Sequence, residues 1–78
     1  MWWKLKKIKE DDREIIYAYG YESHETSGRI RIEKETEAIY AEQLATGDTE
    51  QRFLSLGPHV WRICFREGAP DERMIAVG

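Results

Sequence analysis

The alternation of apolar and polar residues predicts four consecutive strands in the first part of the chain. The clearest run covers residues 13–21, where every second residue from Ile15 to Tyr21 is apolar or aromatic. The other three runs alternate more weakly and span residues 2–8, 29–33 and 38–44. Polar turn clusters separate all four runs, and short connections favour antiparallel neighbours. We therefore expect a β-meander.

After the turn at residues 46–49, the apolar spacing becomes helical from residue 51 to residue 66. The apolar residues that share one arc of this helix are Phe53, Leu56, Val60, Ile63 and Cys64. Asp48 or Thr49 can cap its start, and Gly68 suits its end. Pro58 costs roughly 3 kcal/mol inside a helix. The pattern therefore allows either one helix or two pieces divided at Gly57-Pro58.

Residues 73–77 are most simply one more strand, which completes the order ββββαβ. This order predicts an α+β fold, a mostly antiparallel sheet of about five strands with one helix packed across a face. A chain of 78 residues is too short for two self-sufficient cores, so we expect a single domain over residues 1–78. The sequence leaves open which face of the Tyr17-Tyr19-Tyr21 strand is buried. Facing inward, the tyrosines are core; facing outward, they would form a stacking platform for single-stranded nucleic acid.

Charge is unevenly distributed along the chain. Residues 1–9 hold four Lys and no acid, whereas residues 10–50 hold twelve acids against four basic residues. A net charge of −3 argues against non-specific nucleic-acid binding. The single cysteine excludes an internal disulfide, and no run of residues resembles a signal peptide or a membrane span. These features predict a cytoplasmic protein without membrane partners.

The candidate chemical groups do not form a recognisable catalytic site. Cys64 and His59 are five residues apart on the predicted helix, so their side chains diverge. His24 lies in a predicted turn among acids, without the convergent ligands that a metal needs. The carboxylate-rich clusters Glu10-Asp11-Asp12 and Glu33-x-Glu35-x-Glu37 fall in predicted turns or at exposed strand ends, where water is abundant. We therefore expect a protein that is not an enzyme and that has neither a metal site nor a cofactor.

Two surfaces of the predicted helix are candidates for binding. A second apolar row on the helix consists of Leu54, Trp61 and Phe65. It widens the apolar arc beyond the width that one face of a sheet covers. Together with the N-terminal tryptophans it gives a candidate interaction surface of Trp2, Trp3, Leu54, Trp61 and Phe65. At least one of the three tryptophans should stay substantially exposed. The opposite face carries a basic stripe without a compensating acid, namely Arg52, His59, Arg62 and Arg66.

These surfaces favour a small non-catalytic protein–protein interaction or accessory module that binds an unidentified protein partner. Self-association through the exposed aromatic surface is possible. The first alternative is a nucleic-acid-associated protein that uses Lys4, Lys6, Lys7 and the helix arginines. The second is an acidic inhibitor or decoy that occupies a basic groove on another protein.

Overall fold

The computed structural model describes every residue from Met1 to Gly78, and its elements follow the expected order ββββαβ. The strands and the helix are β1 (Trp2–Glu10), β2 (Glu14–Tyr21), β3 (Gly28–Glu33), β4 (Ile39–Gln43), α1 (Glu50–Phe65) and β5 (Glu72–Ala76). The α+β class predicted from the hydrophobic pattern is confirmed. Each predicted strand agrees with the structure to within two residues at either end.

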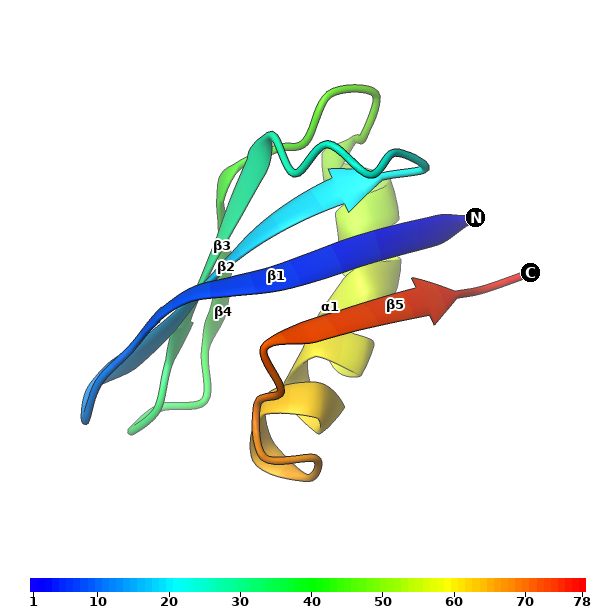
Figure 1. The fold of residues 1–78 in the computed structure, drawn as a ribbon. Helices are drawn as coiled ribbons and strands as arrows, with labels where there is room; N and C mark the ends of the chain where they lie inside the picture. Colours follow the sequence, from blue (N-terminus) through cyan, green and yellow to red (C-terminus); the bar gives the residue numbers. More distant parts are fainter.

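The five strands form one antiparallel sheet in the order β4-β3-β2-β1-β5. The first four strands pair with their neighbours along the chain. The helix then crosses one face and brings β5 back beside β1 (Figure 1). In this pair Trp3 lies opposite Ile75. This route leaves β4 and β5 as the two edges of the sheet. The other face of the sheet has no helix over it.

The helix is continuous from Glu50 to Phe65, although Pro58 lies inside it. Thr49 is its N-cap, since the side-chain oxygen accepts a hydrogen bond from the backbone N–H of Arg52 at 3.1 Å. The chain leaves the helix through Gly68, whose φ of +79° is in the left-handed region that glycine tolerates. The alternative of two helical pieces is thus resolved in favour of one. With 16 residues, α1 is not long and apolar enough to cross a membrane.

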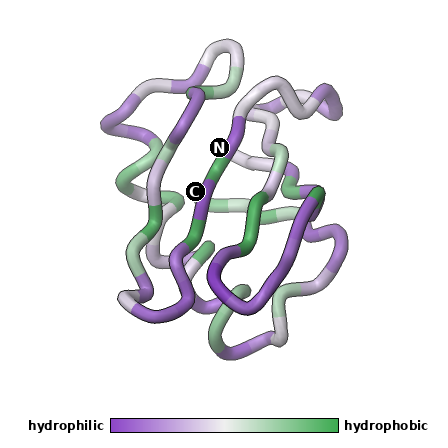
Figure 2. Tube along the Cα trace, turned by 90° about the vertical axis from the view of Figure 1, so that its left-hand side faces the viewer, coloured by the Kyte–Doolittle hydropathy of each residue, from purple (hydrophilic) through white to green (hydrophobic).

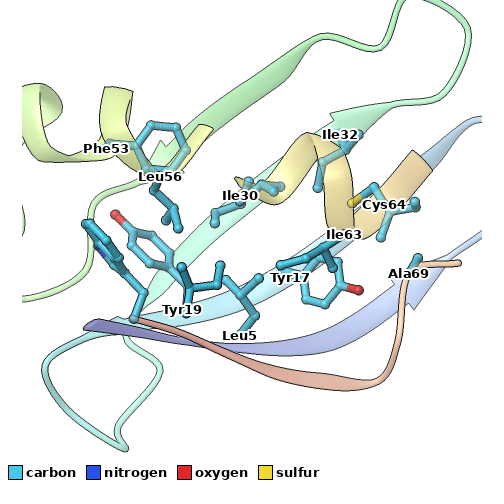
Figure 3. Close-up of a cluster of buried hydrophobic side chains, with 14 of the residues drawn as sticks. Leu5, Tyr17, Tyr19, Ile30, Ile32, Phe53, Leu56, Ile63, Cys64 and Ala69 are labelled. Atoms are coloured by element: carbon cyan, nitrogen blue, oxygen red, sulfur yellow. The ribbon is translucent and has the colours of Figure 1, made fainter. Parts of the chain in front are cut away.

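The core lies between the inner face of the sheet and the helix (Figure 3). The sheet contributes fully buried residues from β1, β2 and β3, and the helix contributes the five residues of its expected apolar arc. Tyr17 and Tyr19 point inward, which settles which face of their strand is buried. Their hydroxyls find partners inside: Tyr17 donates to the carbonyl of Pro70 at 2.6 Å, and Tyr19 donates to Asp48 at 3.1 Å.

Both ends of the chain lie side by side at the β1–β5 edge. The N-terminal amine of Met1 donates to the backbone carbonyl of Val77 at 2.8 Å. Figure 2 shows the two ends adjacent. The acids of the β1–β2 and β3–β4 turns, Asp11, Asp12, Glu35 and Glu37, are exposed. Strand β4 is at the opposite edge of the sheet from β5.

Candidate functional site

Trp3 does not belong to the interaction surface that the sequence suggested. It is fully buried beside the ring of Tyr21, with ring centroids 5.8 Å apart, and its indole Nε1 donates to Asp48 at 3.2 Å. The reason is the two-residue period of β1, which puts Trp3 and Leu5 on the inner face of a strand that has neighbours on both sides. Trp3 is a core residue.

Trp2 is separated from the helix residues of the same predicted surface. It lies on the uncovered face of the sheet, half-buried, with its ring 5.5 Å from that of His24. Trp61 is also half-buried, so none of the three tryptophans is fully exposed. The prediction that at least one of the three tryptophans stays substantially exposed is therefore wrong. The predicted surface divides into Trp2 on one side and Leu54, Trp61 and Phe65 on the other.

The helix residues of the predicted surface face the β4 side of the molecule. Trp61 packs against Phe65 at 5.9 Å between ring centroids, and its Nε1 donates to the Glu37 carboxylate at 2.7 Å. Glu37 belongs to the turn between β3 and β4, so this bond ties α1 to that turn. Leu54 is 75% exposed, which makes it the most exposed large apolar side chain of the chain.

Leu54 borders a groove between α1 and β4 with a volume of about 390 Å³. Five of the six lining residues are hydrophobic, and they are Ile39, Tyr40, Ala41, Phe53 and Leu54, with Glu50 as the sixth. Tyr40 is 42% exposed. A larger hollow of about 440 Å³ at the β1–β2 turn is lined by charged residues and one Thr, without a hydrophobic residue. The α1–β4 groove is therefore the one suited to apolar side chains.

The backbone along this groove has unpaired hydrogen-bonding groups. Glu33 N–H donates to the carbonyl of Ala38 at 2.9 Å, and Tyr40 lies opposite Arg31. Bonded and non-bonded pairs alternate along an antiparallel ladder. The N–H and C=O groups of Ile39 and Ala41 consequently point away from β3, into the open edge of the sheet. The side chains of the same two residues line the groove.

Sequence reasoning missed this edge because it could not place β5. Hairpin connections predict the order of β1 to β4, but β5 could join the sheet at either end. The structure puts β5 beside β1, and β4 is left without an outer neighbour. Residues 39–41 alternate as an ordinary strand does, so no local signal distinguishes an edge strand from a central one.

The predicted basic stripe is divided among other contacts. Arg52 lies over the ring of Tyr21 at 4.9 Å, and Arg66 lies over the ring of Trp61 at 5.4 Å. Arg62 pairs with Glu67 at 3.4 Å, so the expected absence of a compensating acid is wrong. His59 is half-buried on the same helix. The stripe is not a continuous cationic surface.

The lysines of the nucleic-acid alternative also fall on two sides of the sheet. Lys4 and Lys6 lie on the uncovered face, opposite Gly20 and Ala18. Lys7 points the other way, where it pairs with Glu10 at 2.8 Å and donates to the carbonyl of Ala69 at 2.9 Å. Hydrogen bonds from Lys7 and Lys34 lower the pKa of the Glu10 carboxyl. These lysines and the helix arginines do not converge on one site.

Cys64 is buried on the inner side of α1, as its position on the apolar arc predicts. Burial raises the pKa of its thiol to about 12, because the charged thiolate is disfavoured away from water. A thiol of this kind is protonated at neutral pH. Its side chain contributes to the core as a small apolar group.

Comparisons with protein families, with curated proteins and with solved structures find no match to this chain.

Proposed function

We propose that this chain is a non-catalytic protein-interaction module that holds an extended segment of a partner protein along β4. The segment would add a sixth strand to the sheet and place alternate side chains in the α1–β4 groove. The observation that carries this proposal is the juxtaposition of two features: unpaired backbone groups at Ile39 and Ala41, and apolar side chains directly beside them.

The two sheet edges differ in their chemistry. The segment around β5 begins with Pro70, Asp71, Glu72 and Arg73, and charges and prolines are the devices that keep an edge strand unpaired. β4 has the sequence Ile-Tyr-Ala-Glu-Gln, with one charge and no Pro or Lys. Its short length limits uncontrolled pairing. Of the two edges, β4 is the one open to a partner strand.

Leu54 supplies the apolar contact for such a strand. Covering one Leu side chain contributes about 1.5 to 3 kcal/mol, of which most remains available because three-quarters of this side chain is exposed. Backbone hydrogen bonds to Ile39 and Ala41 fix the direction and register of the bound segment. The α1–β4 groove selects partner segments in which every second side chain is apolar and fits into it.

The proposal is tested by selecting peptides of about ten residues from a random display library on the intact chain. Selected peptides are titrated into isotopically labelled protein. We expect amide shifts at Ile39–Gln43 and around Leu54, and slowed hydrogen exchange at the N–H groups of Ile39 and Ala41. Shifts confined to the uncovered face, around Lys4 and Lys6, would refute the proposal.

Two proline variants provide a matched pair. Ala41→Pro removes an N–H that points out of the β4 edge without removing a bond to β3. Ala76→Pro does the same at the β5 edge, since Val77 N–H donates to Met1 and Ala76 lies opposite Trp2. We expect Ala41→Pro to weaken peptide binding at least about tenfold and Ala76→Pro to leave it unchanged. Leu54→Ser, at an exposed position, checks the groove independently of any effect of proline on folding.

A further inference from the structure

We infer that the segment bound along β4 is cationic, with Lys or Arg residues beside its apolar positions. This inference rests on the proposed function and specifies the chemistry of the partner at the same site. The observation behind it is the charge around the groove, where exposed glutamates outnumber the basic residues near them.

Four exposed glutamates lie on β4, in the turn before it or at the start of α1. Glu50 lines the groove at the first turn of α1, and Glu42 projects from β4 itself. Glu35 and Glu37 precede β4 in the turn between β3 and β4, and the Glu37 carboxylate accepts the hydrogen bond of the Trp61 indole. Three of the four, Glu35, Glu37 and Glu50, form no ion pair within the chain.

The nearby cations do not neutralise this rim. Arg31 is shared between Glu33 at 2.7 Å and Glu42 at 3.4 Å. Arg66 lies over the ring of Trp61, whose indole donates to Glu37. A partner strand with flanking positive charges would therefore meet an excess of negative charge along its length. Complementary charge of this kind accelerates association and selects the partner. The attraction between the charges weakens as the salt concentration increases.

The same charges argue against a second copy of this chain as the occupant. Two β4 edges paired with each other would bring two sets of rim glutamates together. Glu42 is part of the paired strand, and Glu37 and Glu50 flank it in both copies. Like charges held together across an interface oppose association. A basic segment from a different protein satisfies both the groove and its rim.

The test uses a library of extended peptides in which alternate positions are fixed as Val and the others are drawn equally from Lys, Glu and Thr. We expect the intact chain to enrich Lys over Glu by at least about tenfold at the variable positions. The binding of the enriched peptides should weaken between about 50 and 500 mM NaCl.

The rim is tested with a triple variant, Glu37→Gln, Glu42→Gln and Glu50→Gln. Gln at position 37 retains a carbonyl oxygen that can accept the Trp61 hydrogen bond. The matched control replaces Asp12, Glu25 and Glu72 by their amides, which changes net charge equally at positions that form no ion pair. We expect the preference for Lys to fall in the rim variant and to persist in the control.

The possible outcomes separate this inference from the proposed function. Enrichment that depends on Ala41 but shows no preference for Lys would overturn the cationic partner and leave the strand-binding module standing. Equal loss of the preference in both triple variants would assign it to net charge and overturn the inference as well. If the intact chain enriches no peptides relative to the Ala41→Pro variant, the proposed function itself is overturned. A dimer of the chain alone at about 100 μM that Ala41→Pro abolishes would assign the edge to a second copy.

Discussion

Replacing Asp48 by Ala should destabilise the fold more than any other change of a single surface carboxylate. One oxygen of Asp48 accepts hydrogen bonds from the indole of Trp3 at 3.2 Å and from the hydroxyl of Tyr19 at 3.1 Å. The other oxygen accepts the backbone N–H of Thr49 at 2.9 Å. Asp48 therefore joins two buried aromatic side chains, from β1 and β2, to the residue that caps α1.

The size of the destabilisation depends on which hydrogen bonds Trp3 and Tyr19 keep after Asp48 is replaced. Trp3 is fully buried and its Nε1–H has no other acceptor, which costs about 1 to 3 kcal/mol. The Tyr19 hydroxyl still accepts the N–H of Ala45 at 3.0 Å, so it loses one net hydrogen bond, about 1 kcal/mol. Asp48 is half-buried, and water entering its place recovers part of this loss. We expect a net loss of about 2 to 3 kcal/mol, or roughly 10 to 20 °C in Tm.

Urea unfolding followed by tryptophan fluorescence and far-ultraviolet circular dichroism measures this loss. Asp12→Ala is the control, because Asp12 is exposed and forms no hydrogen bond through its side chain. A double-mutant cycle of Asp48→Ala with Tyr19→Phe should show a coupling of about 1 kcal/mol. The reasoning is refuted if Asp48→Ala unfolds within about 0.5 kcal/mol of Asp12→Ala.

Three further predictions concern the helix, the thiol and an ion pair. Pro58→Ala should raise the free energy of unfolding by roughly 1 to 3 kcal/mol, because it restores an N–H donor to the carbonyl of Leu54; a lower free energy in urea melts would contradict this. Cys64 should react with a disulfide reagent at pH 8 about a thousandfold more slowly in the native chain than in urea, and comparable rates would show that the thiol is accessible. Hydrogen bonds from Lys7 and Lys34 lower the pKa of Glu10 in the folded chain. The stability that Glu10 contributes to the fold is therefore fully present above its unfolded-state pKa, and it is lost as pH falls through its folded-state pKa. Glu10→Gln should therefore lower stability at pH 7 by less than about 1 kcal/mol, and the difference from the original chain should disappear near pH 2; a difference that persists there would assign the effect to packing.

The fold could be predicted because each element leaves a local periodic signal. The spacing from Phe53 to Cys64 marks the buried arc of α1, and the two-residue period of β2 orders its tyrosines. Pro58 weakened the prediction of a continuous helix. The helix nevertheless continues through it, because Val60 and Ile63 beyond it pack on the same core as Leu56 before it. Tertiary packing outweighs one missing hydrogen bond.

The candidate site could not be predicted because it depends on which elements meet. Ile39 and Ala41 resemble inward residues of any strand, and they border a groove only because no strand covers the outer edge of β4. Grouping the tryptophans by residue type misplaced Trp3, although its spacing from Leu5 already put both on one face of β1. Asp48 was expected only as a possible cap. Its contacts with Trp3 and Tyr19 join residues 45 and 29 positions apart in sequence, beyond any local pattern.

The position of β1 inside the sheet has a kinetic consequence. Three of the strand pairings are between strands that follow one another in the chain. The pairing of β1 with β5 instead joins the two ends of the chain, with Trp2 opposite Ala76. Local pairings form before distant ones, since closing a long loop costs more chain entropy. During folding, β1 therefore has an unpaired edge of its own until α1 has docked and β5 arrives. In this interval Trp3 and Leu5 lie in a temporary edge strand, which makes the arrival of β5 the step that competes with aggregation.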